Sequence, residues 1–420
     1  MRIAFLSAVY TPEREPAGVM AAQLVDRWLQ DGHTVNVYCP FPNRPEGILR
    51  RGWKRRLRSV ENRGNLRVVR CWHWLVGRER RVWNRLLENL TFGCSSVAQA
   101  LLNGKADVLV ISTWPFFAVG FAILLGRFWG VPAIYYVQDL YPEAGVEAGV
   151  LPRDHWTTRL LLHLDRWFCR SSARVILVSE SMKELFIHGR RDFGGKVTVI
   201  ENWIDGDEIK PLPGSPLWRR EHNIPSQVFL ATFAGNLGLL SGADILVRVA
   251  EYLHDRPDIF LLCVGEGVLK RKMASETARL GLTNLRFLPF QPRSRIGEMQ
   301  SAANALILTM RPGGGAASVP SKLITYLAAG RPVVCSAPAH SESHAIIRRS
   351  NAGINVQAGD ARAIADALVS LAENPTATEQ MAHRARQHFI EHFTADRAFR
   401  EFGEVFQSIT RNAGHARLLR

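Results

Sequence analysis

The residues best suited to chemistry in this 420-residue chain surround Lys322. An apolar run from Ala305 to Leu308 leads into Arg311-Pro312-Gly313-Gly314-Gly315, and Pro320-Ser321-Lys322 then begins a helical pattern that ends at Gly330. A helix start offers free backbone N–H groups, and a serine hydroxyl and a lysine ammonium beside it would complete a receptor for phosphate. The alternative is a solvated lysine on an ordinary strand-to-helix connection. The three adjacent glycines favour phosphate, because glycine lets a backbone approach a ligand closely.

Two further glycine turns follow predicted strands in the same half of the chain. Gly235-Asn236-Leu237-Gly238 follows Phe229 to Ala234, and Gly265-Glu266-Gly267, with Lys270 beyond it, follows Ile259 to Val264. Open parallel sheets bind ligands at the carboxyl ends of their strands. Tight turns need glycine in any case, so each turn alone is weak evidence. Three such turns at the same edge of one sheet favour a ligand site there.

Candidate acid–base residues lie in the first half of the chain. Asp139 and Glu143 follow the apolar run Ala133 to Val137. A carboxylate at that point can take a proton from an attacking hydroxyl or orient it. A carboxylate that caps a helix is the alternative. Cysteine and histidine spacing indicates neither a zinc site nor a disulfide framework. His33 is interpreted as a turn residue. The other histidines without a metal-ligand spacing are interpreted as structural: His155, His163, His188, His340 and His344.

These residues must be positioned by buried strands that alternate with helices. Strands that are apolar on both faces and separated by helical patterns predict a parallel sheet covered on both sides. The first half has strand patterns at Arg2 to Ser7, Thr34 to Tyr38, Leu66 to Arg70, Val108 to Ser112, Ala133 to Val137, Arg174 to Val178 and Val197 to Ile200. The second half has them at Phe229 to Ala234, Ile259 to Val264, Leu285 to Leu288, Ala305 to Leu308 and Val333 to Cys335.

The predicted fold class is α/β, with two Rossmann-like domains facing each other across a cleft and helices at the C-terminus. The length suffices for two domains that each bury a core, and 47% hydrophobic residues exclude a disordered chain. The segment from Lys210 to Pro216 reads as a stiff linker. We therefore place the first domain at 1–208, the second at 209–390, and a helical segment that packs back on the first domain at 391–420.

The charge of the chain is concentrated in residues 44–85, the basic segment. It has fourteen Arg and Lys against three Glu, which is +11 of the total formal charge of +15. Trp53, Trp72, Trp74 and Trp83 are interleaved with these charges. Such a segment predicts a polyanionic partner, either nucleic acid or an anionic membrane, with a solvated loop as the alternative. Nothing else in the chain resembles a base-reading module, which disfavours nucleic acid.

Apolar runs are too short for a signal peptide or a membrane span. The longest, Trp114 to Gly126, falls short of the roughly 18–20 residues that cross a bilayer. We therefore expect any membrane contact to be peripheral, and the scattered cysteines fit a reducing cytoplasm.

Taken in order, the motifs resemble the family 4 glycosyltransferases of the two-Rossmann-domain (GT-B) type, in particular the subgroup that makes bacterial O-antigen, colanic acid and related polysaccharides. The likeness covers nearly the whole chain. Its marks are Tyr10-Thr11-Pro12-Glu13 with Gly18, Asp31-Gly32-His33-Thr34-Val35, Phe41-Pro42-Asn43-Arg44-Pro45-Glu46-Gly47, Gln138-Asp139-Leu140-Tyr141-Pro142-Glu143, Glu201-Asn202-Trp203-Ile204-Asp205, Gly235-Asn236-Leu237-Gly238, and Pro320-Ser321-Lys322-Leu323 through Tyr326 to Val334.

The resemblance implies a retaining enzyme without metal or other cofactor. It implies a nucleoside-diphosphate sugar donor in the second domain and a polyprenyl-pyrophosphate-linked saccharide acceptor in the first. Such an acceptor lies at the inner face of the cell membrane, so the resemblance implies a cytoplasmic enzyme that is peripheral on that face. Asp139 and Lys322 are the predicted catalytic residues. The predicted donor-binding residues are Gly235, Asn236, Gly238, Gly265, Glu266, Lys270, Arg311, Gly314, Pro320, Ser321, Lys322 and Thr325. The predicted acceptor-binding residues are Gly18, Asn43 and Glu143. The predicted membrane-facing residues are Arg51, Trp53, Lys54, Arg55 and Arg56.

The chain departs from the family pattern at two places. Thr325 and Ala317 replace a pair of glutamates, of which the later one binds the nucleotide ribose, and Asn236 and Ser241 replace basic residues near the first glycine turn. Pyrophosphate binding would then fall more heavily on Lys322, Lys270 or Arg311. Two other functions therefore stay open: a non-catalytic protein that binds through the basic segment, and a sugar-nucleotide epimerase of the same architecture.

Overall fold

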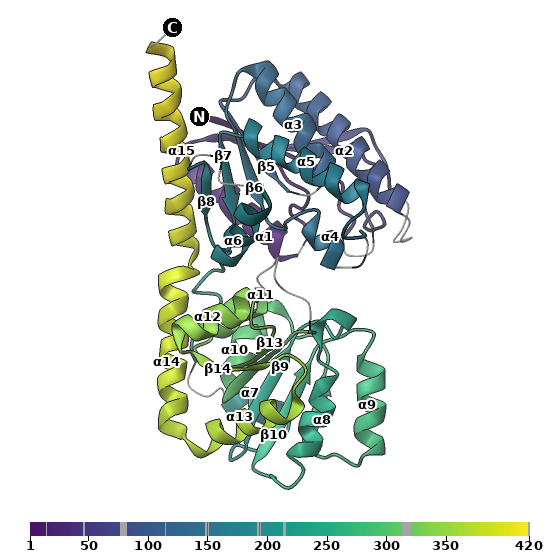
Figure 1. Ribbon diagram of the computed structural model, residues 1–420, viewed down its shortest axis with the longest axis vertical. Helices are drawn as coiled ribbons and strands as arrows, with labels where there is room; N and C mark the ends of the chain where they lie inside the picture. The colour runs from purple at the N-terminus through teal and green to yellow at the C-terminus, as the bar shows by residue number, and fades with distance from the viewer. Residues whose placement is uncertain are drawn as a thin grey trace. The chain divides into compact units, whose positions relative to one another are not determined.

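The computed structural model describes residues 1–13, 15–44, 47–75, 82–113, 115–147, 149, 151–190, 193, 195–212, 216–312 and 321–418. The chain forms two compact units (Figure 1). The N-terminal unit comprises Met1–Ile200 and Phe399–Arg420, and the C-terminal unit comprises Glu201–Ala398. The sequence placed these boundaries at 208/209 and 390/391. The segment after Glu201 stays with the second unit because Ile204 N donates to the Phe393 carbonyl at 3.2 Å and Ile209 packs in the same core as Phe393.

The N-terminal unit contains an eight-stranded sheet in the order β3-β4-β2-β1-β5-β6-β7-β8. All pairs are parallel except β3, which is antiparallel to β4. The strands are β1 Arg2–Leu6, β2 Thr34–Pro40, β3 Arg58–Arg63, β4 Leu66–Cys71, β5 Val108–Ser112, β6 Ala133–Val137, β7 Arg174–Leu177 and β8 Val197–Val199. The helices are α1 Pro16–Gln30, α2 Val82–Asn103, α3 Phe116–Trp129, α4 Glu143–Glu147, α5 Trp156–Ser171, α6 Glu180–Arg190 and α15 Ala395–Leu418.

Helices cover both faces of this sheet, and strand β6 shows why. Successive side chains of a strand point to opposite faces. The Tyr135 ring packs edge-to-face on Phe168 of α5, with centroids 6.3 Å apart, whereas the Tyr136 ring packs on Phe402 of α15 at 5.4 Å. Both tyrosines are buried. A strand that is apolar on both faces therefore needs a helix on each.

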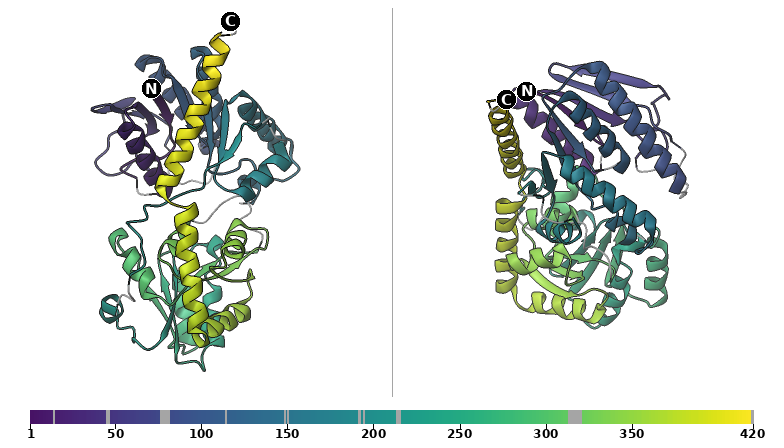
Figure 2. Two further views of the ribbon diagram at one scale, coloured as in Figure 1. Left: turned by 90° about the vertical axis from the view of Figure 1, so that its left-hand side faces the viewer. Right: turned by 45° about the horizontal axis from the view of Figure 1, so that its top comes forward.

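The C-terminal helix α15 belongs to the core of the N-terminal unit. Trp28 of α1 lies 6.4 Å from Phe402 and 5.4 Å from Phe406, measured between ring centroids. Trp28 also packs on Phe5 of β1. Figure 2 shows α15, in yellow, lying along the sheet of this unit. The aromatic residues near the end of the sequence thus cover a sheet made by its beginning.

The C-terminal unit contains a six-stranded, wholly parallel sheet in the order β11-β10-β9-β12-β13-β14. The strands are β9 Phe229–Ala234, β10 Ile259–Val264, β11 Leu285–Leu288, β12 Ala305–Thr309, β13 Val333–Ala337 and β14 Gly353–Gln357. The helices are α7 Pro216–Glu221, α8 Ile245–Tyr252, α9 Lys270–Arg279, α10 Ile296–Ala302, α11 Ser321–Ala328, α12 Glu342–Ser350, α13 Ala361–Glu373 and α14 Pro375–His392, with short 3₁₀ turns at Leu239–Ser241 and Arg293–Arg295.

Two apolar layers enclose this sheet. One contains the buried faces of α8, α9 and α13, and the other contains those of α11, α12 and α14. Trp218 of α7 and Met299 of α10 form a third cluster. The predicted α/β fold of two Rossmann-like sheets with a helical C-terminus is confirmed. No helix in the described ranges is both long enough and apolar enough to cross a membrane.

Candidate active site

Lys322 is the second residue of α11, the helix that follows the glycine-rich connection. Its Nζ lies 4.5 Å from the centre of the Phe233 ring, near the carboxyl end of β9. Burial lowers the pKa of Lys322 to about 8. No carboxylate within the described ranges forms an ion pair with this amine. A desolvated, unpaired ammonium attracts an anion more strongly than a solvated one does.

The first two glycine turns touch each other beside this lysine. The Gly235 N–H donates to the Val264 carbonyl at 2.9 Å. A Cβ on Gly265 would lie 1.9 Å from the Gly235 carbonyl oxygen, and a Cβ on Gly235 would lie 3.2 Å from Lys322 Nζ. Both glycines have positive φ, +154° and +151° for Gly235 and Gly265. The close approach of the two turns to each other and to the amine therefore requires glycine at both positions.

Asn236 completes this cluster. Its Nδ2 would lie 3.4 Å from a Cβ on Gly238, and its Oδ1 2.9 Å from a Cβ on Gly267. The turns are joined by the Leu237 N–H, which donates to the Glu266 carbonyl at 2.8 Å. The structure thus brings together five predicted donor-binding residues, Gly235, Asn236, Gly238, Gly265 and Lys322.

Tyr326 fixes α11 to strand β9, and Thr325 fixes it to helix α10. The Tyr326 hydroxyl accepts from Ala234 N at 2.9 Å and lies 3.0 Å from the Ala234 carbonyl oxygen. The Thr325 hydroxyl accepts from Gln300 Nε2 at 3.0 Å and donates to the Lys322 carbonyl at 2.8 Å. The sequence did not assign a role to Tyr326 or Gln300, whose contacts span 92 and 25 residues. Donor binding by Thr325 stays a prediction.

Two other predicted donor-binding cations have protein partners. Lys270 Nζ lies 2.6 Å from Glu266 Oε1, and Arg311 Nη2 lies 3.1 Å from Asp244 Oδ2 while Arg311 Nε donates to the Leu239 carbonyl. Arg311 lies in the lining of a pocket of about 310 Å³ beside the carboxyl ends of β12 and β13. Ser321 is exposed at the start of α11. Gly314 and Pro320 lie outside the described residues.

Asp139 follows the carboxyl end of β6 in the N-terminal unit. Its surface is accessible to solvent, yet the protein around it displaces enough water to raise the pKa of the carboxyl. The backbone of this loop is held by Gln138 N, which donates to the Thr113 hydroxyl at 2.7 Å. A carboxylate with a raised pKa is a better proton acceptor than an ordinary aspartate.

Glu143 is held by a buried arginine. Arg190 Nη1 and Nη2 lie 2.7 Å and 2.8 Å from the two oxygens of Glu143, and Arg190 Nε donates to Asp165. Asp165 also accepts from the Tyr135 hydroxyl at 2.9 Å. The Arg190 side chain is 0% exposed. The bonds to Arg190 are sufficient to hold Glu143 in place without a bound acceptor saccharide. Acceptor binding by Glu143 stays a prediction.

Asn43 lies in the loop after β2, and Gly18 is the third residue of α1. Glu13 Oε1 accepts from the backbone N–H groups of Asn43 and Arg44, both at 2.8 Å. Asn43 is buried, and its side chain contacts His73. A Cβ on Gly18 would lie 2.9 Å from Val9 Cγ1. Gly18 therefore lets α1 pack closely on the loop after β1.

The predicted membrane-facing residues differ in exposure. Arg51, Lys54, Arg55 and Arg56 are exposed, but the half-buried Trp53 ring packs on Phe41 at 6.0 Å. Arg70, another residue of the basic segment, is buried and lies 5.4 Å from the Trp53 ring. Its Nη1 donates to Cys39 Sγ at 3.1 Å. Part of the basic segment is therefore core structure rather than surface charge.

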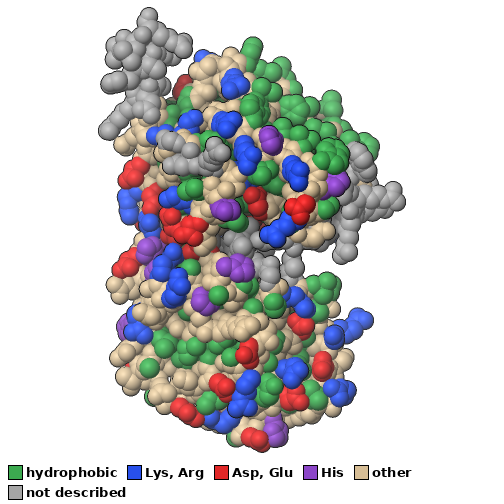
Figure 3. Space-filling view, in the orientation of Figure 1, with side chains coloured by type: hydrophobic (Ala, Val, Ile, Leu, Met, Phe, Trp, Pro, Cys, Tyr) green, Lys and Arg blue, Asp and Glu red, His purple; other side chains and the backbone are tan. Residues whose placement is uncertain are grey.

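A second exposed feature of the N-terminal unit is apolar. Figure 3 shows hydrophobic side chains gathered over α2 and α3. Leu102 is 71% exposed, Phe128 78% and Trp156, at the start of α5, 66%. Leu124 of α3 lies one helical turn before Phe128 and is also exposed. Exposed apolar side chains on neighbouring helices are typical of an interaction surface.

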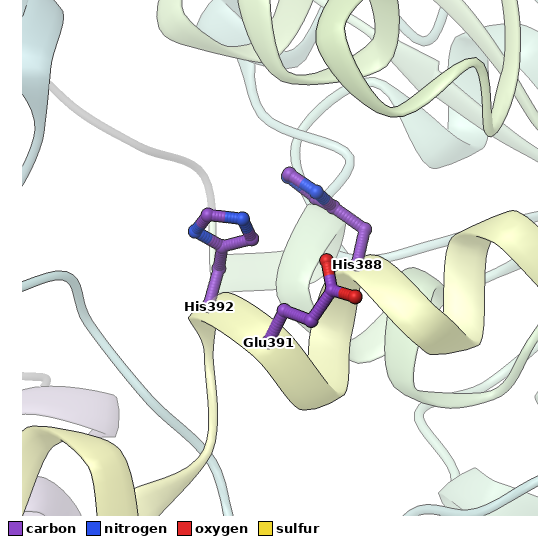
Figure 4. A group of neighbouring side chains, drawn as sticks. All are labelled: His388, Glu391 and His392. Carbon is purple, nitrogen blue, oxygen red and sulfur yellow. The ribbon is translucent and has the colours of Figure 1, made fainter.

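Three side chains near the end of α14 are of metal-ligand type. His388, Glu391 and His392 have ligand atoms within 4.8 Å of one another (Figure 4). Their i, i+3, i+4 spacing, which places all three on one face of a helix, could have been recognised in the sequence. Burial lowers the pKa of His388 to about 4, and the charges of Arg349 and Arg397 act in the same direction. These two charges would also oppose a bound cation, so we assign no metal to the cluster.

Comparison with known proteins places the chain in a family. Residues 17–203 match the family described as glycosyl transferase 4-like domain, and residues 215–388 match glycosyl transferases group 1. The chain is 23% identical over 348 residues to the putative colanic acid biosynthesis glycosyl transferase WcaI of Escherichia coli K12, covering 81% of this chain and 84% of that protein. It is 25% identical over 282 residues to the probable glycosyltransferase WbjE of Pseudomonas aeruginosa, covering 65% and 66%.

A solved structure supports the fold. Anabaena HepE in complex with UDP-glucose superposes with a TM-score of 0.66 at 15% identity, over 97% of this chain and 100% of that one. The two family matches together extend over most of both units. The chain is therefore a glycosyltransferase of the family 4 type, in which a glycosyl transferase 4-like domain and a group 1 domain form the GT-B fold.

Proposed function

We propose that this enzyme transfers a hexose-type sugar from a nucleoside diphosphate to a lipid-linked saccharide, with retention of anomeric configuration and without a metal ion. The single observation that supports this most directly is the desolvated, unpaired ammonium of Lys322 beside two glycine turns. The relative WcaI, whose name refers to colanic acid biosynthesis, supports a context of O-antigen or exopolysaccharide synthesis.

The chemistry of donor cleavage needs such a group. When the bond between sugar and phosphate breaks, negative charge grows on the leaving pyrophosphate while the sugar becomes cation-like. Lys322 and the free N–H groups at the start of α11 supply fixed positive charge to the leaving group. Because Lys322 has no carboxylate partner in the described ranges, its field is not cancelled before the donor binds.

The remaining donor contacts follow from the glycine turns. The backbone at Gly235 and Gly265 has no side chain between it and a ligand. Lys270 and Arg311 would exchange Glu266 and Asp244 for phosphate oxygens when a donor binds. HepE, whose structure holds UDP-glucose, supports a nucleotide sugar as the donor class. In the N-terminal unit, the raised pKa of Asp139 supports a role in orienting or deprotonating the acceptor hydroxyl.

The acceptor would be reached at an anionic membrane surface. Each Lys or Arg near such a surface contributes roughly 1 kcal/mol of attraction, so four of them would contribute about 4 kcal/mol. Arg51, Lys54, Arg55 and Arg56 are exposed for this contact. The apolar side chains of α2 and α3 could enter the headgroup region. These features support a peripheral, inner-face location.

Nucleotide release tests the proposal directly. The purified chain is incubated with a panel of sugar nucleotides, with and without a polyprenyl-pyrophosphate saccharide and with a chelator, and the product anomer is assigned by NMR. We expect acceptor-dependent release of one nucleoside diphosphate, unchanged by the chelator, and a product of the donor's anomeric configuration. An inverted product or a metal requirement would contradict the mechanism. Acceptor-independent isomerisation would identify an epimerase, and no release together with tight nucleic-acid binding would identify a binding protein.

A further inference from the structure

The basic segment contains a pocket that none of the roles above uses. It has a volume of about 350 Å³ and is lined by Phe41, Arg55, Arg56, Trp72, His73 and Trp74, among others. A volume of this size is within the range of pockets that hold small ligands. All of these residues belong to the N-terminal unit.

The floor of the pocket is neutral and fixed. Asn43 Nδ2 donates to the Phe41 carbonyl at 2.9 Å and lies 3.0 Å from His73 Nε2. Because an amide nitrogen only donates, His73 accepts at Nε2 and has its proton on Nδ1, which lies 3.4 Å from the Cys71 carbonyl oxygen. Burial lowers the pKa of His73 to about 4. The floor therefore contributes no charge at neutral pH.

The aromatic walls are built on rigid structure. Trp72, His73 and Trp74 directly follow strand β4. Trp72 N donates to the Leu57 carbonyl at 3.2 Å, and Trp74 N donates to the Thr91 hydroxyl of α2 at 2.9 Å. Trp74 is exposed and Trp72 is half-buried. Indole rings that are partly open to solvent offer a flat apolar face together with a polar N–H, which suits a sugar ring.

The charge of the pocket comes from its two arginines. Arg55 and Arg56 are exposed, and neither forms an ion pair with a carboxylate in the described part of the chain. Arg55 Nη2 makes one long hydrogen bond, 3.4 Å, to the Leu75 carbonyl. None of the described residues that line the pocket is acidic. Two unpaired guanidinium groups with forked donors are suited to phosphate oxygens.

Together, these observations point to a ligand that has both a ring and an anion. We infer that this pocket binds the phosphorylated sugar head group of the acceptor, with the sugar between the tryptophans and the phosphate on Arg55 and Arg56. The inference rests on the proposed function and changes it in one respect: Arg55 and Arg56 bind a defined head group rather than the bilayer at large. Asn43 then acts as a positioning residue, because it fixes the His73 ring.

Direct binding measurements without donor separate this inference from the transfer reaction. The probes are a short-chain prenyl-pyrophosphate N-acetylhexosamine, a hexose 1-phosphate, inorganic phosphate and phosphatidylglycerol vesicles, each titrated into the full chain by calorimetry. The test variant is Arg55→Gln/Arg56→Gln, and a second variant is Trp74→Leu. The matched control is Arg58→Gln/Arg63→Gln, which removes the same charge from exposed residues of the same segment that do not line the pocket.

We expect the test variant to weaken binding of the prenyl-pyrophosphate sugar by about ten-fold or more, since hydrogen bonds between charged groups are lost. Trp74→Leu should weaken the sugar probes but not inorganic phosphate. The control should leave the sugar probes unchanged. Hexose 1-phosphate binding as tight as that of the prenyl probe would assign the pocket to a free sugar phosphate and overturn the lipid-linked assignment.

The inference would be overturned if the test and control variants weakened binding equally, or if the test variant bound the sugar probes as tightly as the wild type. It would also be overturned if the test variant weakened binding to vesicles alone, because Arg55 and Arg56 would then bind the bilayer rather than a head group. Thermal unfolding checks that each variant is folded. If the pocket binds the probes but the chain turns over no donor, only the proposed function is contradicted. If the chain transfers sugar and the pocket variants bind the acceptor as tightly as the wild type, only this inference is contradicted.

Discussion

The ammonium of Lys322 lies 4.5 Å from the centre of the Phe233 ring, at the sheet edge where the glycine turns meet. The aromatic face attracts the cation but, unlike a carboxylate, leaves most of its charge uncompensated. The ring therefore holds the amine in place while keeping it available to an anionic ligand.

Replacing Lys322 by alanine should reduce turnover strongly while the fold is retained. Removing one preorganised group that stabilises transition-state charge typically costs about 10²–10³ in kcat. Initial rates of nucleotide release measure this effect, and Lys210→Ala, an exposed lysine of the same unit, is the control. Wild-type rates in Lys322→Ala would remove the basis of the proposed mechanism.

The pH dependence of kcat/KM should report the lysine. Its pKa in the folded chain is about 8, below the ordinary value of 10.5, so the free enzyme loses this charge as pH rises through 8. We expect kcat/KM to fall above pH 8, and Lys322→Arg, which keeps its charge, to lack that fall. A profile that is the same in both proteins would show that another group titrates.

The lowered pKa of Lys322 also predicts that stability rises with pH, whereas kcat/KM falls. Between about pH 8 and 10.5 the unfolded chain holds a proton on this lysine that the folded chain has lost. The free energy of unfolding contributed by this group therefore rises with pH across that window. Urea unfolding below and above pH 8 should show a larger gain for the wild type than for Lys322→Met.

Gly265→Ala should destabilise the chain by more than backbone strain alone. The added Cβ would lie 1.9 Å from the Gly235 carbonyl oxygen, so the two turns must move apart. Gly281→Ala is a matched control, because Gly281 also has positive φ, +64°, but no atom within 4 Å of the new Cβ. We expect a loss of about 1–2 kcal/mol for the control and about 1–3 kcal/mol more for Gly265→Ala, measured by chemical denaturation. Equal losses would mean that the turns are not in contact.

Arg190→Met should lower the free energy of unfolding of the N-terminal unit, as measured by chemical denaturation. It leaves Asp165 buried and Glu143 part-buried without their cationic partner, which typically costs about 3–5 kcal/mol. Arg256→Met, which breaks surface ion pairs with Asp258 and Glu373, should cost far less, because exposed ion pairs contribute little to stability. If Arg190→Met is as stable as the wild type, the network does not hold this unit together, and Glu143 is free to serve an acceptor.

Phe128→Glu should weaken binding to anionic vesicles if the apolar surface of α2 and α3 enters the bilayer. The side chain is 78% exposed, so the substitution should leave the core unchanged. Val268→Glu is the control, since Val268 is 76% exposed in the C-terminal unit. Cosedimentation measures both variants. Equal losses would indicate charge repulsion rather than insertion.

Much of the fold could be predicted because most strands and helices have a hydrophobic pattern within their own residues. The apolar runs around β1, β5 and β12 were recognisable from their own residues. Strand β3, Arg-Ser-Val-Glu-Asn-Arg, was not, because it is a polar edge strand that exists only through its antiparallel pairing with β4. Strand β14, half-buried at the other sheet's edge, was missed for a similar reason.

The candidate site shows the same division. Lys322 and the glycine turns were found because strand, turn and helix follow one another in sequence. The partner of Glu143 was not, since Arg190 lies 47 residues away. Likewise, the sequence did not distinguish Arg70 from the other cations of the basic segment, and only the packing of Tyr10, Cys39 and Trp53 around it shows that it is buried.

The pairing of Trp28 with Phe402 and Phe406 has a consequence for biosynthesis. While the ribosome makes the chain, the part of this sheet around Tyr136 and the side of α1 that carries Trp28 stay uncovered until α15 emerges, after the whole C-terminal unit has been made. The nascent chain thus exposes apolar surface from the time that β8 completes the sheet until α15 emerges. A premature stop codon shortly before Phe402 would leave a product prone to aggregate rather than a slightly shortened enzyme.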